Sequence, residues 1–278
     1  MSFLVFALLV FLGSALAGLV GALTGLGGGV LLVPMLVLLF GVDLKLALGA
    51  SLVSVIATSS GAAAAYVREG FTNLRIGMLL EVATTLGAVA GATLTAILPH
   101  RLVAGVFGLV LLHAAYTGLR NLDQDAQAEP GPSDPLALRL RLEGAYPGPK
   151  DPVSYRVHRV LPGFALMGLA GVLSGLLGIG SGAVKVLAMD RVMGLPYKVS
   201  TTTSNFMIGV TAAASAGIYL KNGFIHPDLA FPVMLGVLLG ALLGARALPG
   251  ARVGRLRTLF VGVVALLGVE MLIQGLRG

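Results

Sequence analysis

Two glycine runs are the residues whose spacing best supports chemistry in this sequence. Each run lies between a long and a short apolar segment, where glycine breaks a helix because it reaches positive φ at little cost. The next helix then begins with free N–H groups and a positive dipole end, which together bind anions. Close packing of small residues is the alternative explanation. The predicted backbone ligands of a small anion are Gly27, Gly28, Gly29, Gly180, Ser181 and Gly182.

Lys185 lies one helical turn after the second glycine run, inside an apolar segment. A lysine at the centre of a membrane helix costs about 2.5–3.5 kcal/mol, so it needs a partner such as a substrate anion or a carboxylate. The alternative is that its ammonium extends to the membrane surface. Asp190 and Arg191 follow in the same segment and are predicted to pair with each other.

Hydroxyl and amide side chains follow each short segment, notably Ser51 in the first half and Ser204 and Asn205 in the second. Such residues are ordinary helix N-caps. They could equally donate hydrogen bonds to the oxygens of a small anion. Both interpretations stay open, although Ser51 and Ser204 recur at matching places in the two halves.

Glu81 lies about two turns into an apolar helix, where a carboxylate is a candidate for proton coupling or ion pairing. Glu270 is similar but lies nearer a helix end, and His113 is predicted to be a satisfied interior histidine. The chain has no Cys, and it contains no H-E-x-x-H or G-x-S-x-G motif. We therefore expect no metal site, no cofactor and no enzymatic activity.

The elements that position these residues are membrane helices. Of 278 residues, 56% are hydrophobic and 11% are charged, against about 25% charged in soluble domains. This composition excludes an ordinary soluble enzyme, a disordered protein and a nucleic-acid binder, and it predicts an all-α polytopic membrane protein. The predicted helical segments are Phe3–Thr24, Gly29–Val42, Leu46–Val67, Leu74–Leu98, Leu102–Leu119, Val160–Leu177, Gly182–Met193, Val199–Leu220, Pro227–Leu248 and Leu256–Gln274.

A polar, proline-rich stretch separates two apolar halves. It suits a solvated linker, with one short helix near Leu136–Leu142. The predicted division is therefore a transmembrane repeat over 1–120, a cytoplasmic linker over 121–157 and a second transmembrane repeat over 158–278. Residues 14–17 resemble a signal-peptide cleavage site, but no positive charge precedes them, so we expect the first segment to be retained.

The two halves match when the sequence is shifted by 153 residues, without a gap between residues 25 and 92. The matches fall mainly on Gly, Ser and Thr, where backbone geometry or polarity matters. Internal repeats of this kind are typical of secondary transporters. Among the matching pairs are Gly25/Gly178, Gly27/Gly180, Gly29/Gly182, Gly41/Gly194, Lys45/Lys198, Ser51/Ser204, Thr58/Thr211, Tyr66/Tyr219, Gly70/Gly223, Phe71/Phe224, Gly87/Gly240 and Gly91/Gly244.

The distribution of Lys and Arg favours inverted repeats. If each short segment crosses the membrane or forms a hairpin with the preceding helix, 14 of the 19 Lys and Arg residues lie on one side and four on the other, with Lys185 inside a segment. If the short segment re-enters alone, the repeats are parallel and the split is ten against eight. The positive-inside rule prefers the first arrangement. We expect both termini outside, the linker in the cytoplasm, and glycine breaks or hairpins at the membrane midplane.

The stretch from Gly18 to Pro34, GLVGALTGLGGGVLLVP, resembles the signature of the TauE/SafE family of sulfite exporters. ALGASL at 47–52 resembles the second conserved block of that family, and 175–182 with Thr203 and Ser204 resembles its repeat. The resemblance covers nearly the whole chain outside the linker. It implies an inner-membrane permease for small sulfur-containing anions or organic acids. The chain departs from the pattern because Ser181 replaces a glycine and no proline follows the second run.

Together, these features predict a secondary transporter of small sulfur-containing oxyanions, with sulfite export as the first choice. The anion would bind at the midplane between the two glycine breaks, and the halves would rock to give alternating access. The expected partners are the anion, the lipid bilayer and a coupling proton at Glu81, with no nucleic acid. A passive anion channel, a permease for organic carboxylates and a structural membrane subunit remain alternatives.

Overall fold

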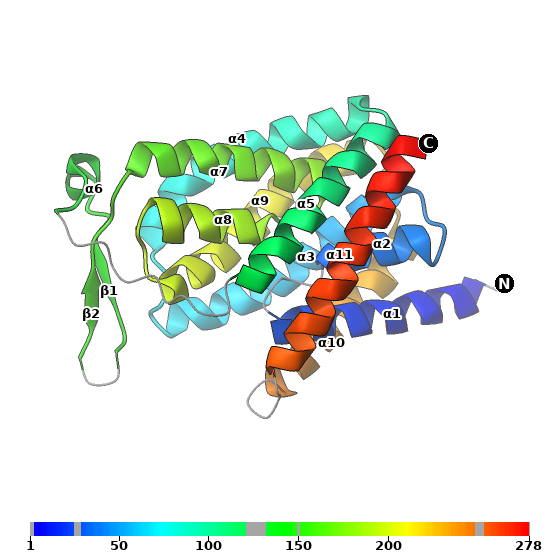
Figure 1. Ribbon diagram of the computed structural model, residues 1–278, viewed down its shortest axis with the longest axis horizontal. Coiled ribbons are helices and arrows are strands. Elements are labelled where there is room, and N and C mark those ends of the chain that lie inside the picture. The colour runs from blue at the N-terminus through cyan, green and yellow to red at the C-terminus, as the bar shows by residue number, and fades with distance from the viewer. Residues whose placement is uncertain (1–2, 25–28, 121–131, 149–150, 248–252, 278) are drawn as a thin grey trace.

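The computed structural model describes residues 3–24, 29–120, 132–148, 151–247 and 253–277. Helices make up almost all of this part of the chain (Figure 1). The elements in chain order are α1 Phe3–Thr24, α2 Gly29–Leu38, α3 Leu44–Arg68, α4 Leu74–Ile97, α5 His100–Arg120, α6 Pro135–Arg139, β1 Gly144–Tyr146, β2 Val153–Tyr155, α7 Val160–Leu177, α8 Gly182–Leu187, the π-helix η1 Ala188–Val192, α9 Tyr197–Lys221, α10 Pro227–Ala247 and α11 Val253–Arg277.

The helices confirm an all-α polytopic membrane protein. Within the described residues, four helices are long and apolar enough to cross a membrane: α3, α4, α7 and α10. Helices α1, α2, α5 and α11 carry shorter apolar stretches. Large aliphatic side chains such as Leu86 and Leu266 point outward, 68% and 71% exposed. Exposed leucine on this scale suits lipid rather than water.

The two short segments are too short to cross a membrane alone. Helix α2 has ten residues, which at about 1.5 Å per residue is about 15 Å, half of a hydrocarbon core of about 30 Å. The predicted extension of this segment to Val42 is wrong, because the chain turns at Gly41 with φ +63°. Helix α2 packs against its neighbours α1 and α3, and α8 packs against α7 and α9. Each short segment therefore folds back on the preceding helix.

The closest helix pairs join the two halves of the chain: α1 packs on α10, and α4 packs on α7. Glycine makes this possible. A Cβ added to Gly87 would collide with the carbonyl of Gly168, and one added to Gly240 would collide with that of Ala15. Both partners also differ by 153 residues, so the shift that relates the sequences also relates these contacts. In Figure 1, α1 begins at the N mark and α7 begins at the opposite end, beside the linker strands.

A second set of contacts follows the same shift. The Lys45 ammonium lies 5.3 Å from the centre of the Phe224 ring. The Lys198 ammonium lies 5.8 Å from the centre of the Phe71 ring. Each pair joins the start of one long helix to the loop that follows the other long helix. The two helices, α3 and α9, also pack together. Cation–π contacts of this kind help to fix the ends of both helices.

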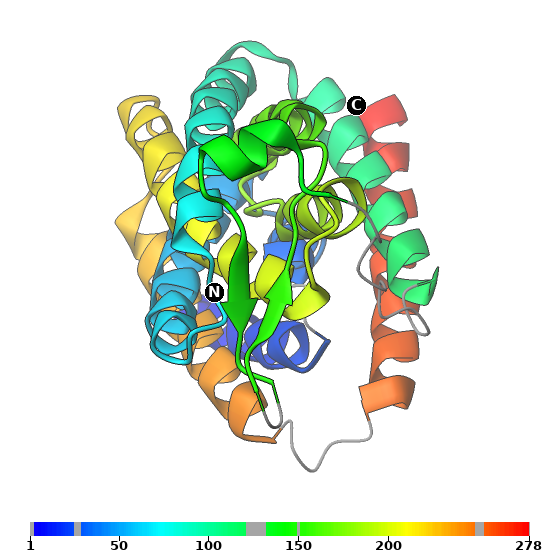
Figure 2. The same ribbon diagram turned by 90° about the vertical axis from the view of Figure 1, so that its left-hand side faces the viewer.

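The described part of the linker contains more regular structure than the sequence predicts. Helix α6 is shorter than expected, and the antiparallel strands β1 and β2 form a hairpin at one end of the molecule (Figure 2). The Asp134 side chain accepts hydrogen bonds from the N–H groups of Leu136 and Val160, at 2.9 and 3.0 Å. It therefore caps α6 and ties it to the start of α7. Three-residue strands carry too little alternation to be recognised from sequence.

The linker also binds the N-terminal end of α4. Asn73, the N-cap of α4, donates from its amide to the Leu142 carbonyl at 2.9 Å and to the Tyr155 hydroxyl at 2.7 Å. Its backbone N–H donates to Thr203 on α9 at 3.0 Å. Burial raises the pKa of the Tyr155 phenol above its usual value, so the hydroxyl stays neutral. This end of α4 is therefore fixed to both the linker and α9.

Candidate functional site

The second glycine run breaks the helix through a left-handed turn. Helix α7 ends at Leu177, because Gly178 and Gly180 take φ of 62° and 76°. Ser181 also has positive φ, at 44°, which is uncommon for a residue with a side chain. Its hydroxyl donates to the Ala170 carbonyl at 2.6 Å, and this bond holds the turn in place. Helix α8 starts at the next residue.

Gly29, the described end of the first glycine run, lies beside the second run. The predicted ligands Gly27 and Gly28 lie outside the described residues. Gly29 begins α2, and a Cβ added there would lie 3.1 Å from Ser51 Oγ and 3.6 Å from the Cα of Ile179. Residues from both breaks therefore meet at one place inside the molecule, with a serine hydroxyl next to them.

The two repeated serines occupy equivalent positions. Ser51 faces Gly29, and Ser204 faces Gly182. The Ser204 hydroxyl donates to the Gly182 carbonyl at 3.4 Å. Ser51 is fully buried, and its Oγ has no hydrogen-bond partner among the described residues. Asn205 is half-buried, and its amide donates to a carbonyl four residues earlier in α9 at 3.1 Å.

Lys185 and Glu81 meet through a threonine. Lys185 is fully buried, and its ammonium donates to the hydroxyl of Thr211 on α9 at 2.6 Å. That hydroxyl lies 2.8 Å from Glu81 Oε1 on α4, and Thr85 donates to the same oxygen at 3.0 Å. A buried ammonium and carboxylate are thus linked across three helices. Extension of Lys185 to the membrane surface is therefore wrong in this structure.

Sequence reasoning missed Thr211 as the link. The available signal was its recurrence, because Thr58 occupies the matching place in the first half. Among the described residues, Thr58 donates only to carbonyls of its own helix, at 3.0 Å to Ser54 and 3.3 Å to Val55. Its shift-related neighbours would be Leu32 and Met234, which carry no charge.

Several buried polar atoms of this region lack a hydrogen-bond partner among the described residues. They include Glu81 Oε2, Ser51 Oγ and Ser174 Oγ. Buried polar groups are nearly always paired, so such atoms mark places where a ligand, a proton or water completes the site. Glu81 and Ser51 are also the predicted coupling and binding residues.

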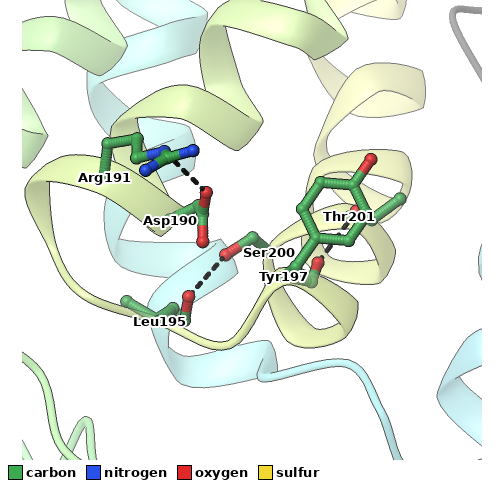
Figure 3. Close-up of polar contacts among 6 residues, drawn as sticks. All are labelled: Asp190, Arg191, Leu195, Tyr197, Ser200 and Thr201. Atoms are coloured by element: carbon green, nitrogen blue, oxygen red, sulfur yellow. Dashed lines mark hydrogen bonds and ion pairs between the residues drawn. The ribbon is translucent and has the colours of Figure 1, made fainter. Parts of the chain in front are cut away.

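Asp190 pairs with Arg191, as predicted. Figure 3 shows the two side chains on the π-helix η1, with Arg191 Nε 3.4 Å from Asp190 Oδ2. Below them, Ser200 donates to the Leu195 carbonyl at 3.5 Å. Thr201 donates to a carbonyl four residues earlier at 2.8 Å. Because Asp190 is paired with Arg191, Glu81 is the carboxylate linked to Lys185.

The hydroxyls that open α9 are not N-caps. Pro196 is the N-cap residue, and no side chain caps this helix. Thr202 bonds to the carbonyl of Lys198 at 2.9 Å, as hydroxyls inside helices commonly do.

Two other polar residues lie away from this region. Glu270 on α11 is exposed. His113 on α5 is exposed as well, so its predicted interior position is wrong. The helix turns Leu111 and Ala114 inward instead. In the described part of the chain, no three His, Asp or Glu side chains come together as a metal site would require.

The fold defines a polytopic membrane protein with a buried charge network inside it. The family described as sulfite exporter TauE/SafE matches residues 10–271. The chain therefore belongs to the TauE/SafE family, as the glycine signature indicates.

Curated relatives are described as probable membrane transporter proteins. The probable membrane transporter protein YunE of Bacillus subtilis (strain 168) is 26% identical and covers 98% of both chains. The probable membrane transporter protein YdhB of the same organism is 29% identical over 86% of this chain and 89% of its own. A Sinorhizobium probable membrane transporter protein, ORF9, is 24% identical over 97% of this chain and 94% of its own. No solved structure matches the chain.

Proposed function

We propose that this protein is a secondary transporter that exports a small sulfur-containing oxyanion, with sulfite as its first substrate. The observation that carries the proposal is Lys185, an ammonium with 0% exposure in the interior of a membrane protein. Such a charge is costly and marks a functional site by default. Membership of the sulfite exporter family supplies the substrate class.

The anion would bind where the two glycine breaks meet. Backbone N–H groups at Gly27–Gly29 and Gly180–Gly182 would face it, with hydroxyl donors from Ser51 and Ser204. Support comes from the buried Ser51 hydroxyl, which lies beside the start of α2 and has no hydrogen-bond partner within the described ranges. Lys185, one turn into α8, would add its charge to the binding of the same anion. Ser181 and Asn205 would shape the site while their polar groups stay bonded to carbonyls.

The transport cycle would use two inverted halves, residues 1–120 and 158–278, joined by a cytoplasmic linker at 121–157. Rocking of α1 with α10 against α4 with α7 would expose the site to each side in turn. The exchanged helix pairs and the opposed directions of α1 and α7 support this arrangement. The protein would sit in the inner membrane with both termini outside, on the basis of its Lys and Arg distribution.

The first test is ligand-dependent stability of the purified protein in detergent. Sulfite, sulfate, thiosulfate, sulfoacetate, taurine and acetate would be compared by thermal unfolding, since a ligand of the native state raises the melting temperature. We expect a selective shift with sulfite or a sulfonate. Gly29→Val should abolish it, because the added side chain would meet Ser51. Gly262→Val is the matched control, since open space surrounds Gly262.

Flux into proteoliposomes separates the alternatives. Saturable transport that responds to an imposed anion gradient supports a carrier. Flux without saturation would favour a passive anion channel. A thermal shift with acetate alone would favour a permease for organic carboxylates, and no response to any anion would overturn the proposal.

A further inference from the structure

One hydroxyl proton is shared between two acceptors at the centre of the charge network. Thr211 Oγ1 lies 2.8 Å from Glu81 Oε1 and 2.8 Å from the carbonyl of Met207. It also accepts from Lys185 at 2.6 Å. A hydroxyl has a single proton. Thr211 can therefore donate to only one of these acceptors at a time.

The two choices correspond to two charge states of Glu81. When Glu81 is ionised, the Thr211 proton points to Oε1, because a charged acceptor binds it more strongly than a carbonyl. When Oε1 carries a proton, Glu81 donates to Thr211, whose own proton then turns to Met207. The Lys185 hydrogen bond persists in both states. The network thus accepts a proton without moving a heavy atom.

No other charged side chain neutralises Lys185 in the described structure. Helix α4 packs on α7 and α9. Helix α7 has no charged residue, and α9 has Lys198 and Lys221 only near its ends, together with Tyr197 and Tyr219. The Tyr219 hydroxyl donates to the Gly175 carbonyl at 2.9 Å.

Helix α8 has no other charge, and on the adjoining η1 Asp190 pairs with Arg191. Glu81 is therefore the counter-charge of Lys185.

We propose that Glu81 and the transported anion compete as the counter-charge of Lys185, so that each anion binds together with one proton on Glu81. Protonation of Glu81 leaves the buried ammonium without a counter-charge, and this favours binding of an anion beside it. When Glu81 loses its proton, it becomes the counter-charge of Lys185 again and the anion dissociates. This inference rests on the proposed function and specifies its coupling. With fully ionised sulfite, the loaded site has one negative charge more than the empty site with ionised Glu81. The negative-inside membrane potential drives that charge outward.

The test is the pH dependence of sulfite binding in the full-length protein and in Glu81→Gln. The glutamine imitates the protonated carboxyl, and any titration of sulfite itself is common to both proteins. We expect the variant to bind sulfite more tightly at high pH. The ratio of the two dissociation constants should fall about tenfold for each pH unit lowered, as required for one linked proton. Glu270→Gln is the matched control and should follow the unmodified protein.

A second readout counts the proton directly. Sulfite is added to weakly buffered protein at a pH where Glu81 is ionised. The unmodified protein should then take up about one more proton per site than Glu81→Gln, which is measured as a larger rise in pH. The double variant Glu81→Gln, Lys185→Met leaves no unpaired charge and should bind no sulfite at any pH.

The outcomes separate the two proposals. If the unmodified protein binds sulfite with the same pH dependence as Glu81→Gln, the competition is wrong while the transporter proposal stands. If the double variant still binds sulfite, Lys185 is not the anion's partner, and the competition is again wrong. If neither the unmodified protein nor Glu81→Gln binds any sulfur oxyanion, both proposals fail.

Discussion

The two halves of the molecule share a backbone frame, but the buried ion pair of Lys185 and Glu81 occurs at only one of two equivalent places. Gly87 and Gly240 meet equivalent carbonyls, and Ser51 and Ser204 face equivalent glycines. Thr211 joins Lys185 to Glu81. The matching Thr58 bonds to its own helix and, within the described structure, to nothing else. The frame is duplicated, and the ion pair is not.

The difference separates what builds the fold from what acts on an ion. Glycine and serine at repeated positions allow close approach of helices, which both halves need. A buried ion pair does little for stability, since desolvation offsets its attraction. Glu81 comes from the first half and Lys185 from the second, and the shift-related residues Met234 and Leu32 carry no charge. An ion pair that occurs at one of two equivalent places therefore points to a task that is asymmetric, such as coupling to a proton. The predictions below probe this contrast.

The largest effect should come from Lys185→Leu, which gives the second half the residue that Leu32 provides in the first. Glu81 would be left as a buried carboxylate without a counter-charge, which costs about 3–5 kcal/mol. We expect a large drop in melting temperature and loss of anion binding. The double variant Lys185→Leu, Glu81→Met should recover the melting temperature but not the binding. If binding persists in either variant, the contrast between the halves is not functional.

Thr211→Val and Thr58→Val compare the paired threonines directly. Thr211→Val removes a hydrogen bond to each of two charged groups, and we expect a loss of about 1.5–3 kcal/mol. Thr58→Val removes a bond within one helix and should cost less than about 1 kcal/mol. Unfolding in detergent measures both. Equal losses would show that the charge network adds nothing at this position.

Gly87→Ala and Gly240→Ala test the shared frame rather than the difference. Each added methyl group would meet a backbone carbonyl across a helix pair, and overpacking of this kind costs about 1–3 kcal/mol. We expect similar drops in melting temperature for both, and little change for Gly262→Ala. A drop in only one of the pair would contradict the equivalence of the halves.

The smallest effect should come from Tyr155→Phe, which removes one contact between the linker and the start of α4 in the first half. Loss of its bond to Asn73 should cost about 0.5–1.5 kcal/mol. Because burial raises the pKa of this phenol, its contribution is complete below the ordinary tyrosine pKa of about 10 and declines as pH rises above it. Melting at pH 8 and above pH 10 should show this decline, and the variant should lack it.

Much of the fold follows from hydropathy and glycine positions. Helices α1 and α7 span the residues predicted for them, and most others differ by a few residues at their ends. The failures have physical causes. The segment after Gly182 divides into α8 and the π-helix η1, a rare helix type that hydrophobic spacing does not reveal. The hairpin of the linker is joined to α4 by the hydrogen bond between Tyr155 in β2 and Asn73. These two residues lie far apart in the sequence.

The candidate site was only partly accessible from the sequence. Lys185 and Glu81 stood out singly, because charge inside an apolar segment is visible in one dimension. Their connection needs α4, α8 and α9 in one place, and no local pattern encodes that. Thr211 looked like an ordinary helix residue, since threonine inside a helix usually bonds to its own backbone.

The exchange of helix partners also has a consequence for biosynthesis. Helix α1 is made first, but its closest partner α10 begins 203 residues after α1 ends (227 − 24). At about 5–20 residues per second, α1 waits on the order of 10–40 s in the bilayer before α10 exists. Its glycine-lined face must be tolerated by lipid throughout that interval. The absence of any charged residue from α1 suits a helix that must enter the membrane and remain there alone until its partner arrives.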